Sequence, residues 1–298
     1  MHFSRNRSTA RNVVRLPAVA GDFRGFYPST PSILSEQVGE LIDNADAKPT
    51  TGELIGLIAP HAGYAYSGQV AGNAYKLLKG KSFDTVILIG LSHRYRVQGA
   101  AIYPQGAFRT PLGDIEIDEE LAAQIIERSD TVVELPEAHE EEHSLEVQLP
   151  FLQQSCSPLR IVPILLQDDS PENVHSLSQA IAQAVKDKFV LLVGSTDLCH
   201  YPEYKEAVKS DRVVVEAIKH FDTDYLRGQM DEYMQAHSGV PELHCMMCST
   251  GAVYTTMETA KRLGANRLEI LKATNSGDVP NGGRDRVVGY MAAALYRS

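Results

Sequence analysis

The sequence of 298 residues lacks the segments that mark membrane and exported proteins. No apolar stretch reaches the roughly 20 residues that a transmembrane helix needs. The first residues carry four arginines, at positions 5, 7, 11 and 15, but no apolar core of the kind found in signal peptides. We therefore expect a cytoplasmic protein that has no membrane partner.

The sequence also has fewer basic than acidic residues. Lys and Arg number 28 against 38 Asp and Glu, which gives a formal net charge of −10, and no long basic run is present. This balance argues against a large nucleic-acid-binding surface. There are only four cysteines, Cys156, Cys199, Cys245 and Cys248, in a chain too long to need disulfide staples. Both points favour a reducing compartment and no nucleic-acid partner.

Several familiar motifs are missing. The sequence contains no G-x-G-x-x-G, no Walker loop and no G-x-S-x-G, which removes the common phosphate-binding loops and the nucleophile elbow of α/β-hydrolases. Cys245 and Cys248 form a C-x-x-C, but no second pair exists to complete a structural zinc site. Either cysteine of this pair remains open as a metal ligand, a reactive thiol at a helix start, or a small buried hydrophobe.

What the sequence does contain is an alternation of apolar strands and amphipathic helices. Longer strands are predicted at 54–60, 84–90, 160–167, 189–196, 267–276 and 286–296, with shorter ones at 99–104 and 113–118. Helices are predicted at 30–45, 67–79, 118–129, 143–156, 170–187, 206–221, 223–237 and 249–263. This pattern predicts a single three-layer α/β/α domain over residues 1–298 with a largely parallel or mixed sheet. Residues 1–29 are expected to be an irregular segment packed on that domain.

Three histidines directly follow predicted buried strands. They are His61, His93 and His200. The carboxyl ends of parallel strands form the edge at which open α/β sheets bind ligands. Imidazole is the commonest metal ligand and transfers protons near neutral pH. The three placements together predict a site at this edge.

Polar neighbours accompany two of these histidines. Ser92 and Arg94 flank His93 and are suited to binding a substrate or an anion. Asp197 is close enough to His200 to share a proton or a ligand with it and to fix its tautomer.

One segment allows a different interpretation. Residues His139 to His143 match H-E-x-x-H, in which Glu140 would activate a zinc-bound water for peptide hydrolysis. The surrounding sequence is almost wholly polar, which favours a solvated helix start instead. His143 and Glu146, three residues apart, are still placed to face one pocket together.

An ordered set of segments resembles the Memo family, also called the AmmeMemoRadiSam system protein B family. The matching segments span nearly the whole chain and are PAVAG (17–21), APHAGYAYSG (59–68), GLSHR (90–94), TPLGDIEID (110–118), EHSLEVQLPFL (142–152), VPILL (162–166), GSTDLCHY (194–201) and the stretch 245–251. The resemblance implies the fold of the class III extradiol dioxygenases, which are LigB-like non-haem iron enzymes.

The resemblance also implies roles for individual residues. The metal would be held by His61, His93 and Cys245. Catalytic acid–base or supporting roles fall to His143, Asp197 and His200. The residues assigned to substrate or anion binding are Tyr64, Ser92, Arg94 and Glu146.

These assignments predict a metal-binding protein that uses one transition metal ion. Fe(II) is the first expectation, with Cu or Zn as alternatives, because a thiolate ligand shifts preference toward softer ions. The main prediction is a metal-dependent redox enzyme, dioxygenase-like, acting on an unknown small molecule. One alternative is a module that captures a phosphopeptide or another anion, as the family's link to phosphotyrosine peptides implies. The other is the H-E-x-x-H zinc peptidase.

Overall fold

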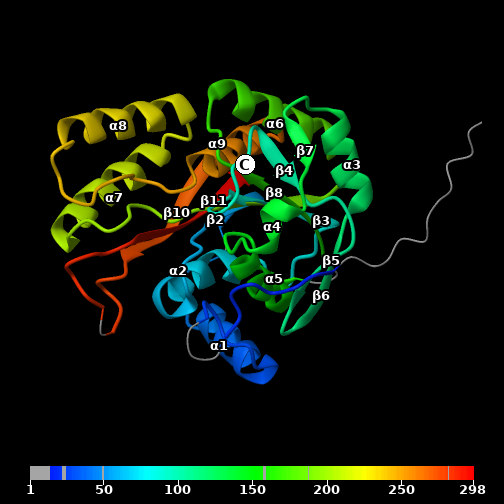
Figure 1. Cartoon of the computed structure of the whole chain (residues 1–298), viewed down its shortest axis with the longest axis horizontal. Coiled ribbons are helices and arrows are strands. Elements are labelled where there is room, and N and C mark those ends of the chain that lie inside the picture. Colours follow the sequence, from blue (N-terminus) through cyan, green and yellow to red (C-terminus); the bar gives the residue numbers. More distant parts are fainter. Residues whose placement is uncertain (1–13, 22–24, 49, 157–158, 187, 281) are drawn as a thin grey trace, which may run out of the picture.

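The computed structural model describes residues 14–21, 25–48, 50–156, 159–186, 188–280 and 282–298 (Figure 1). The first 13 residues of the irregular segment predicted at 1–29 lie outside this range. The described helices are α1 (Pro31–Asp43), α2 (Tyr64–Lys76), α3 (Glu119–Glu127), α4 (Glu137–Glu140), α5 (Leu149–Ser155), α6 (Pro171–Ala184), α7 (Tyr204–Ile218), α8 (Thr223–Ala236), α9 (Thr250–Arg262) and the 3-10 helix η1 (Glu146–Gln148). The described strands are β1 (Val14–Arg15), β2 (Glu53–Ala59), β3 (Thr85–Leu91), β4 (Ala100–Ile102), β5 (Ala107–Thr110), β6 (Gly113–Ile117), β7 (Val132–Glu134), β8 (Arg160–Leu166), β9 (Val190–Ser195), β10 (Arg267–Asn275) and β11 (Gly289–Arg297).

All the described strands join one mixed sheet. Its main order is β1-β5-β6-β8-β3-β9-β2-β11-β10, with β4 paired to both β7 and β8. The centre, β8-β3-β9-β2, is parallel, whereas β11 runs antiparallel to both β2 and β10. Strands buried on both faces need continuous apolar sequence, and TVILIGL in β3 provides it. The predicted α/β fold with a mixed sheet is thus confirmed.

Helices cover both faces of the sheet (Figure 1). Alternate side chains of β2 point to opposite faces, so that Leu57 joins one apolar cluster and Ile58 the other. Helices α1, α2 and α5 contribute to the Leu57 side, and α3, α6, α7, α8 and α9 to the Ile58 side. The result is the expected three-layer arrangement.

The sheet brings together the chain segments that carry the predicted site. Strands β3, β9 and β2 are neighbours and parallel, so their carboxyl ends share one edge. His93 follows β3, Asp197 follows β9 and His61 follows β2. Three connections that are distant in sequence therefore converge at the same place.

The main departure from the predicted elements lies between residues 137 and 155. A single helix was expected over 143–156, but residues 143–145 are not helical and the helical part is divided into η1 and α5; the short α4 precedes this segment. The backbone amides of His143 and Ser144 donate to the carboxylate of Glu142 and not to backbone carbonyls, as they would inside a helix. Pro150 lies in the first turn of α5, where a proline is tolerated. The short strands β1, β5 and β7 were also not predicted.

Among the described helices, none combines the length and the apolar character that crossing a bilayer would require.

Candidate metal centre

Three imidazole rings meet at the carboxyl edge of the sheet. His61, His93 and His143 each offer a ring nitrogen, and these atoms lie within 4.8 Å of one another. The ring centroids of His93 and His143 are 4.4 Å apart, and that of His61 lies 5.2 Å and 5.5 Å from them. We call these three residues the histidine group. Three converging imidazoles form a donor set that transition metals bind.

Glu142 orients His93. One carboxylate oxygen lies 2.9 Å from His93 Nδ1, and the other accepts the backbone amide of the same residue at 2.6 Å. Burial would raise the pKa of Glu142, but the hydrogen bonds from His93 and from the Ser144 amide outweigh it and hold the pKa at about 2. The ionised carboxylate accepts a hydrogen bond from the protonated Nδ1 of His93. The lone pair on Nε2 of the same ring is then free to bind a metal.

His61 is buried, with 1% of its surface exposed. Its backbone amide donates to Asp197 Oδ1 at 2.8 Å, and its Nδ1 lies 3.0 Å from Ser195 Oγ. Its Nε2 is 3.3 Å from Cys248 Sγ. Burial lowers the pKa of His61, so the ring is neutral at neutral pH.

His143 completes the group from the loop between α4 and η1. Burial, reinforced by the nearby His61, lowers the pKa of His143 to about 3. Its ring packs edge-on against Phe26, with the centroids 4.7 Å apart. Because metals bind neutral imidazole, the depressed pKa values of His61 and His143 favour metal binding at neutral pH.

The two cysteines of the C-x-x-C occupy different positions. Cys248 lies beside His61, and its Sγ also accepts the backbone amide of Asp197 at 3.2 Å. The thiol of Cys245 is hydrogen-bonded by the backbone of His200 instead. Within the described part of the chain, Cys245 does not belong to the histidine group, and its role as a ligand stays a prediction.

Asp197 and His200 lie beside the histidine group. Asp197 Oδ2 is 3.8 Å from His200 Nε2 and 4.0 Å from His61 Nε2. Burial raises the pKa of Asp197, but the two histidines more than offset this and keep it below its usual value. His200 Nε2 is buried, and no hydrogen-bond partner within the described residues satisfies it.

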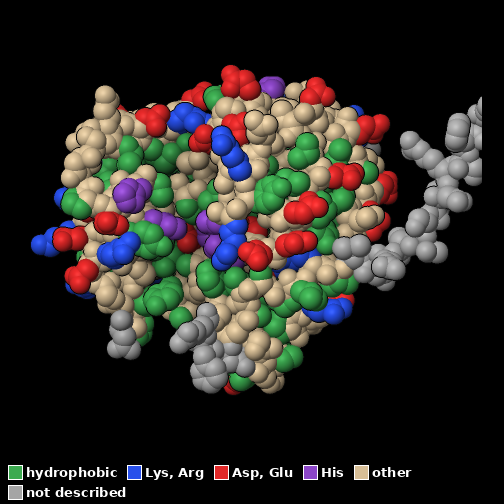
Figure 2. Space-filling view, viewed as in Figure 1, with side chains coloured by type: hydrophobic (Ala, Val, Ile, Leu, Met, Phe, Trp, Pro, Cys, Tyr) green, Lys and Arg blue, Asp and Glu red, His purple; other side chains and the backbone are tan. Residues whose placement is uncertain are grey.

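A cavity of about 630 Å³ opens over these side chains. His93, His143, Asp197 and His200 line it together with residues that are mostly aromatic or small. These are Gly25, Phe26, Ala62, Gly63, Tyr66, Tyr201, Ser276, Gly283, Arg286, Val288 and Tyr290. Figure 2 shows histidine side chains gathered among hydrophobic ones on this face of the molecule. We call this space the main cavity; its volume suits a small molecule.

None of the four residues assigned to substrate or anion binding lines the main cavity. The hydroxyl of Tyr64 donates to the carbonyl of Val147 at 2.6 Å, and that of Ser92 donates to the carbonyl of Tyr95 at 2.7 Å. Glu146 is fully buried against the N-terminal segment. Their contacts, as they stand, are with the protein itself.

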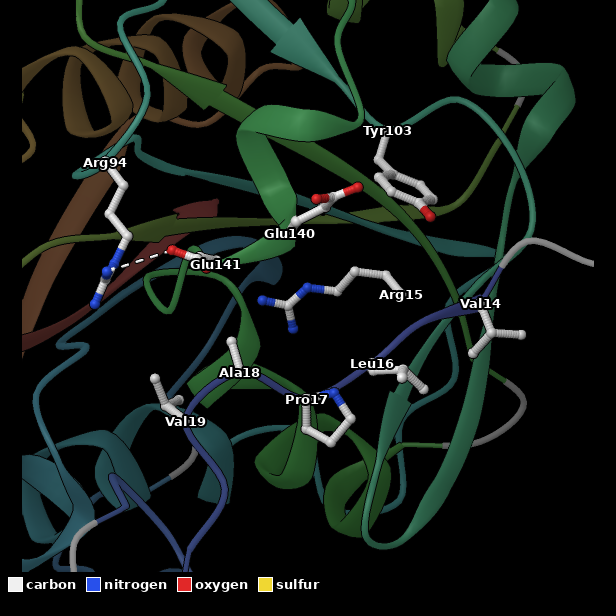
Figure 3. Close-up of a pocket in the computed structure, with 10 residues that line it drawn as sticks. All are labelled: Val14, Arg15, Leu16, Pro17, Ala18, Val19, Arg94, Tyr103, Glu140 and Glu141. Carbon is white, nitrogen blue, oxygen red and sulfur yellow. Dashed lines mark hydrogen bonds and ion pairs between the residues drawn. The ribbon is translucent and has the colours of Figure 1, made fainter.

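Arg94 lies at a second cavity, of about 570 Å³, between the N-terminal segment and α4 (Figure 3). Its guanidinium is 3.4 Å from the carboxylate of Glu141, and Glu140 lines the same space. An anion bound there would meet the carboxylates of Glu140 and Glu141 as well as Arg94 and Arg15, and Arg15 is already paired with Glu146.

The H-E-x-x-H segment is not assembled as a zinc-binding helix. Helix α4 ends at Glu140, before the second histidine. The first histidine, His139, points away from the histidine group: its Nε2 lies 3.2 Å from the carbonyl of Ala101, and its ring packs against Tyr103 and Phe108. The two histidines of the motif therefore do not share one face.

Two functional contacts escaped the sequence analysis. Glu142 is one of four acidic residues near His139, and nothing in the sequence distinguishes the one that binds His93. Ser195 ends β9 and contacts His61, which only the strand order reveals. The residue pattern left both cysteines open and the family resemblance favoured Cys245, whereas the cysteine beside His61 in the structure is Cys248.

Comparison with known proteins gives one consistent result. The sequence model of the family described as Memo-like protein matches residues 15–294. A MEMO1 family protein of Methanopyrus kandleri is 34% identical over 297 residues, covering 95% of this chain and 99% of the relative. A MEMO1 family protein of Nitrosopumilus maritimus is 34% identical over 286 residues, covering 94% and 98%.

Proposed function

The chain belongs to the Memo family, and from that premise we propose that it is a metal-dependent redox enzyme acting on a small molecule in the main cavity. The observation that carries this proposal is the histidine group, whose ring nitrogens converge within 4.8 Å beside that cavity. The fold shared with class III extradiol dioxygenases, which the sequence resemblance implies, makes Fe(II) the first metal to test, and Cu or Zn the next.

The residues present fit a transition metal. The histidine group would hold it, and the thiol of Cys248, 3.3 Å from His61 Nε2, is the nearest additional donor. A bound metal would supply Lewis-acid or one-electron chemistry. Three imidazoles with a nearby thiol depart from the usual 2-His-1-carboxylate site of iron oxygenases, so ordinary ring cleavage is not the expected reaction.

The chain's own groups would handle protons and orientation. His200 lines the main cavity, and Asp197 Oδ2 lies 3.8 Å from its Nε2. A proton taken by His200 from a bound molecule would be stabilised by the Asp197 carboxylate. The rings of Phe26, Tyr66 and Tyr201 would exclude water from one side of that molecule.

The test is metal content. Protein purified without oxygen and reconstituted with Fe(II), Cu(I) or Zn(II) should bind about one ion per chain, as measured by elemental analysis after desalting. His61→Ala and His93→Ala should each lose that ion. His244→Ala is the matched control, because its side chain is 74% exposed and outside the site.

A wild-type chain that stays metal-free after all three reconstitutions would contradict the proposal. Retention of one ion by both histidine variants would contradict the assigned site. Consumption of oxygen or of another electron acceptor with candidate substrates would then address the redox step.

The two alternatives raised by the sequence are less well supported. Capture of a phosphopeptide by Arg94 would have to overcome Glu140 and Glu141 in the same cavity, where the second arginine, Arg15, is already paired with Glu146. The zinc peptidase would need Glu140 beside a metal, whereas His139 is turned toward Ala101. Saturable phosphopeptide binding that Arg94→Gln abolishes would restore the first, and zinc-dependent cleavage that Glu140→Gln abolishes would restore the second.

A further inference from the structure

A buried chain of polar groups contacts His61 through Ser195. It links Tyr75 of α2, Gln148 of η1 and Ser195 at the end of β9, all fully buried. None of the three lines the main cavity. They are therefore placed to act through His61 and not on a bound molecule.

The orientation of the Gln148 amide follows from its partners. The carbonyl of Pro60 only accepts hydrogen bonds, so the atom of Gln148 that lies 2.9 Å from it must be the nitrogen. The second hydrogen of the same nitrogen points to Ser195 Oγ, also at 2.9 Å. Consistently, the amide oxygen accepts the hydroxyl of Tyr75 at 2.7 Å. Every polar atom of this side chain is used.

The single proton of Ser195 is also accounted for. Its Oγ lies 2.6 Å from the carbonyl of Ser144, which can only accept, so the hydroxyl donates there. The lone pairs of Oγ then receive the amide hydrogen of Gln148 and face His61 Nδ1 at 3.0 Å. Since Ser195 has no second proton to give, His61 Nδ1 must carry one.

We propose that Ser195, held in place by Gln148, is a positioning residue that fixes His61 as the Nδ1–H tautomer and so directs its Nε2 lone pair toward Cys248 and the other two imidazoles. The inference rests on the proposed metal-binding function for its purpose, but the tautomer itself exists without a metal. The Cys248 Sγ at 3.3 Å from Nε2 agrees with it, because a neutral thiol donates to a bare nitrogen. A partner on the far nitrogen commonly fixes the tautomer of a metal-binding histidine.

The test begins with the metal-free wild-type protein. In a long-range 1H–15N spectrum of the histidine rings, with the His61 signals identified by their absence in His61→Gln, the ring proton should be on Nδ1. Ser195→Ala removes the acceptor of that proton, and we expect its spectrum to show the Nε2–H form, alone or mixed. The affinity for Co(II), measured by titration, should fall about 10- to 100-fold.

Two further variants separate positioning from packing. Ser195→Thr keeps the hydroxyl, and we expect it to keep the Nδ1–H signal. Ser178→Ala removes an equally buried serine hydroxyl from α6, far from the site, and should leave Co(II) affinity unchanged.

A wild-type spectrum with the His61 proton on Nε2 overturns the proposal, and this measurement needs no variant to fold. A Ser195→Ala protein with an unchanged spectrum and unchanged Co(II) affinity overturns it as well. If the wild-type chain shows the Nδ1–H form and Ser195→Ala changes it, but the chain binds no metal, the positioning assignment holds and the proposed function is the one that fails.

Discussion

The carboxylate of Glu142 contacts two imidazoles and accepts three backbone amides. It lies 2.9 Å from His93 Nδ1 and 3.4 Å from His143 Nδ1, and it accepts the amides of His93, His143 and Ser144. These bonds favour the charged form and outweigh the burial that opposes it, so the pKa falls from 4.5 to about 2. The difference corresponds to about 3 kcal/mol of stability. Because the folded pKa is depressed, this contribution is complete above about pH 5 and is lost as the pH falls toward 2.

Glu142→Gln should therefore weaken both the fold and the metal site. The amide still hydrogen-bonds but carries no charge to hold the proton of His93 Nδ1. We expect Co(II) affinity to fall about 10- to 100-fold and the urea midpoint to decrease. Glu141→Gln is the matched control, because the neighbouring carboxylate is 77% exposed and outside the histidine group. If both variants had the same Co(II) affinity and the same urea midpoint, the role given to Glu142 would be wrong.

At the scale of elements, the N-terminal segment is tied to the fold by one buried carboxylate. Glu146 forms a buried ion pair with Arg15, accepts the amides of Ala18 and Val19, and accepts the hydroxyl of Tyr27. Arg15 also donates to the carbonyl of Glu142 at 2.6 Å. The segment thus supports the same loop that supplies His143.

Replacing Glu146 by Gln should be costly, because it leaves the Arg15 charge buried without a counter-charge. We expect a loss of about 3–5 kcal/mol in urea denaturation. Asp43→Asn serves as the comparison: its ion pair with Lys79 is exposed, and its midpoint should stay that of the wild type. A small effect in both variants would mean that the buried pair is not needed for stability.

Strand β3 lies so close to the loop that carries His143 that Gly90 has no room for a side chain. A Cβ there would lie 2.6 Å from Leu145 Cδ2 and 2.8 Å from Ser144 Oγ. Gly90→Ala should cost about 1–3 kcal/mol in unfolding experiments and weaken metal binding by displacing the neighbouring His143. Gly228→Ala, in the open interior of α8, should instead stabilise by up to about 1 kcal/mol. If Gly90→Ala keeps the stability and the metal affinity of the wild type, the loop can move to accept the methyl group and the prediction is wrong.

Elements with a strong periodic pattern were predictable, and those shaped by particular side-chain contacts were not. The strand β3 and the histidine after it follow from apolar sequence alone. The start of the helix predicted at 143–156 was wrong, because the amides of His143 and Ser144 bond to the carboxylate of Glu142 and the helical part begins only at Glu146. Such side-chain contacts leave no periodic signal. The same holds for the choice of Cys248 as the neighbour of His61, which depends on how α9 meets the sheet.

For the whole molecule, buried histidines should make stability depend on pH. Burial lowers the pKa of both His139 and His143 to about 3, from 6.5 in the unfolded chain. Below pH 6.5 the unfolded chain takes up protons that the folded chain does not, so the free energy of unfolding falls as the pH falls from 6.5 to 3. Burial raises the pKa of Asp211 to about 7, which acts in the opposite direction from pH 7 down to 3.8.

Part of the pH dependence of the unfolding free energy should come from His143. For metal-free protein, we expect His143→Gln to flatten the fall in unfolding free energy between pH 6 and pH 4 by about 1.4 kcal/mol per pH unit. His244→Gln, which alters an exposed ring, should leave the slope unchanged. Urea denaturation at several pH values measures both, and parallel curves for His143→Gln and the wild type would refute the assignment.

The residues of the candidate metal centre are far apart in the sequence, so they can meet only late in folding. His61 and Cys248 are 187 residues apart and meet only after β2, β9 and α9 have come together. If the chain binds a metal ion, we expect the ion to bind only after these elements have assembled and not to nucleate folding. Refolding from urea should therefore proceed at the same rate with or without metal, while unfolding of the loaded protein slows.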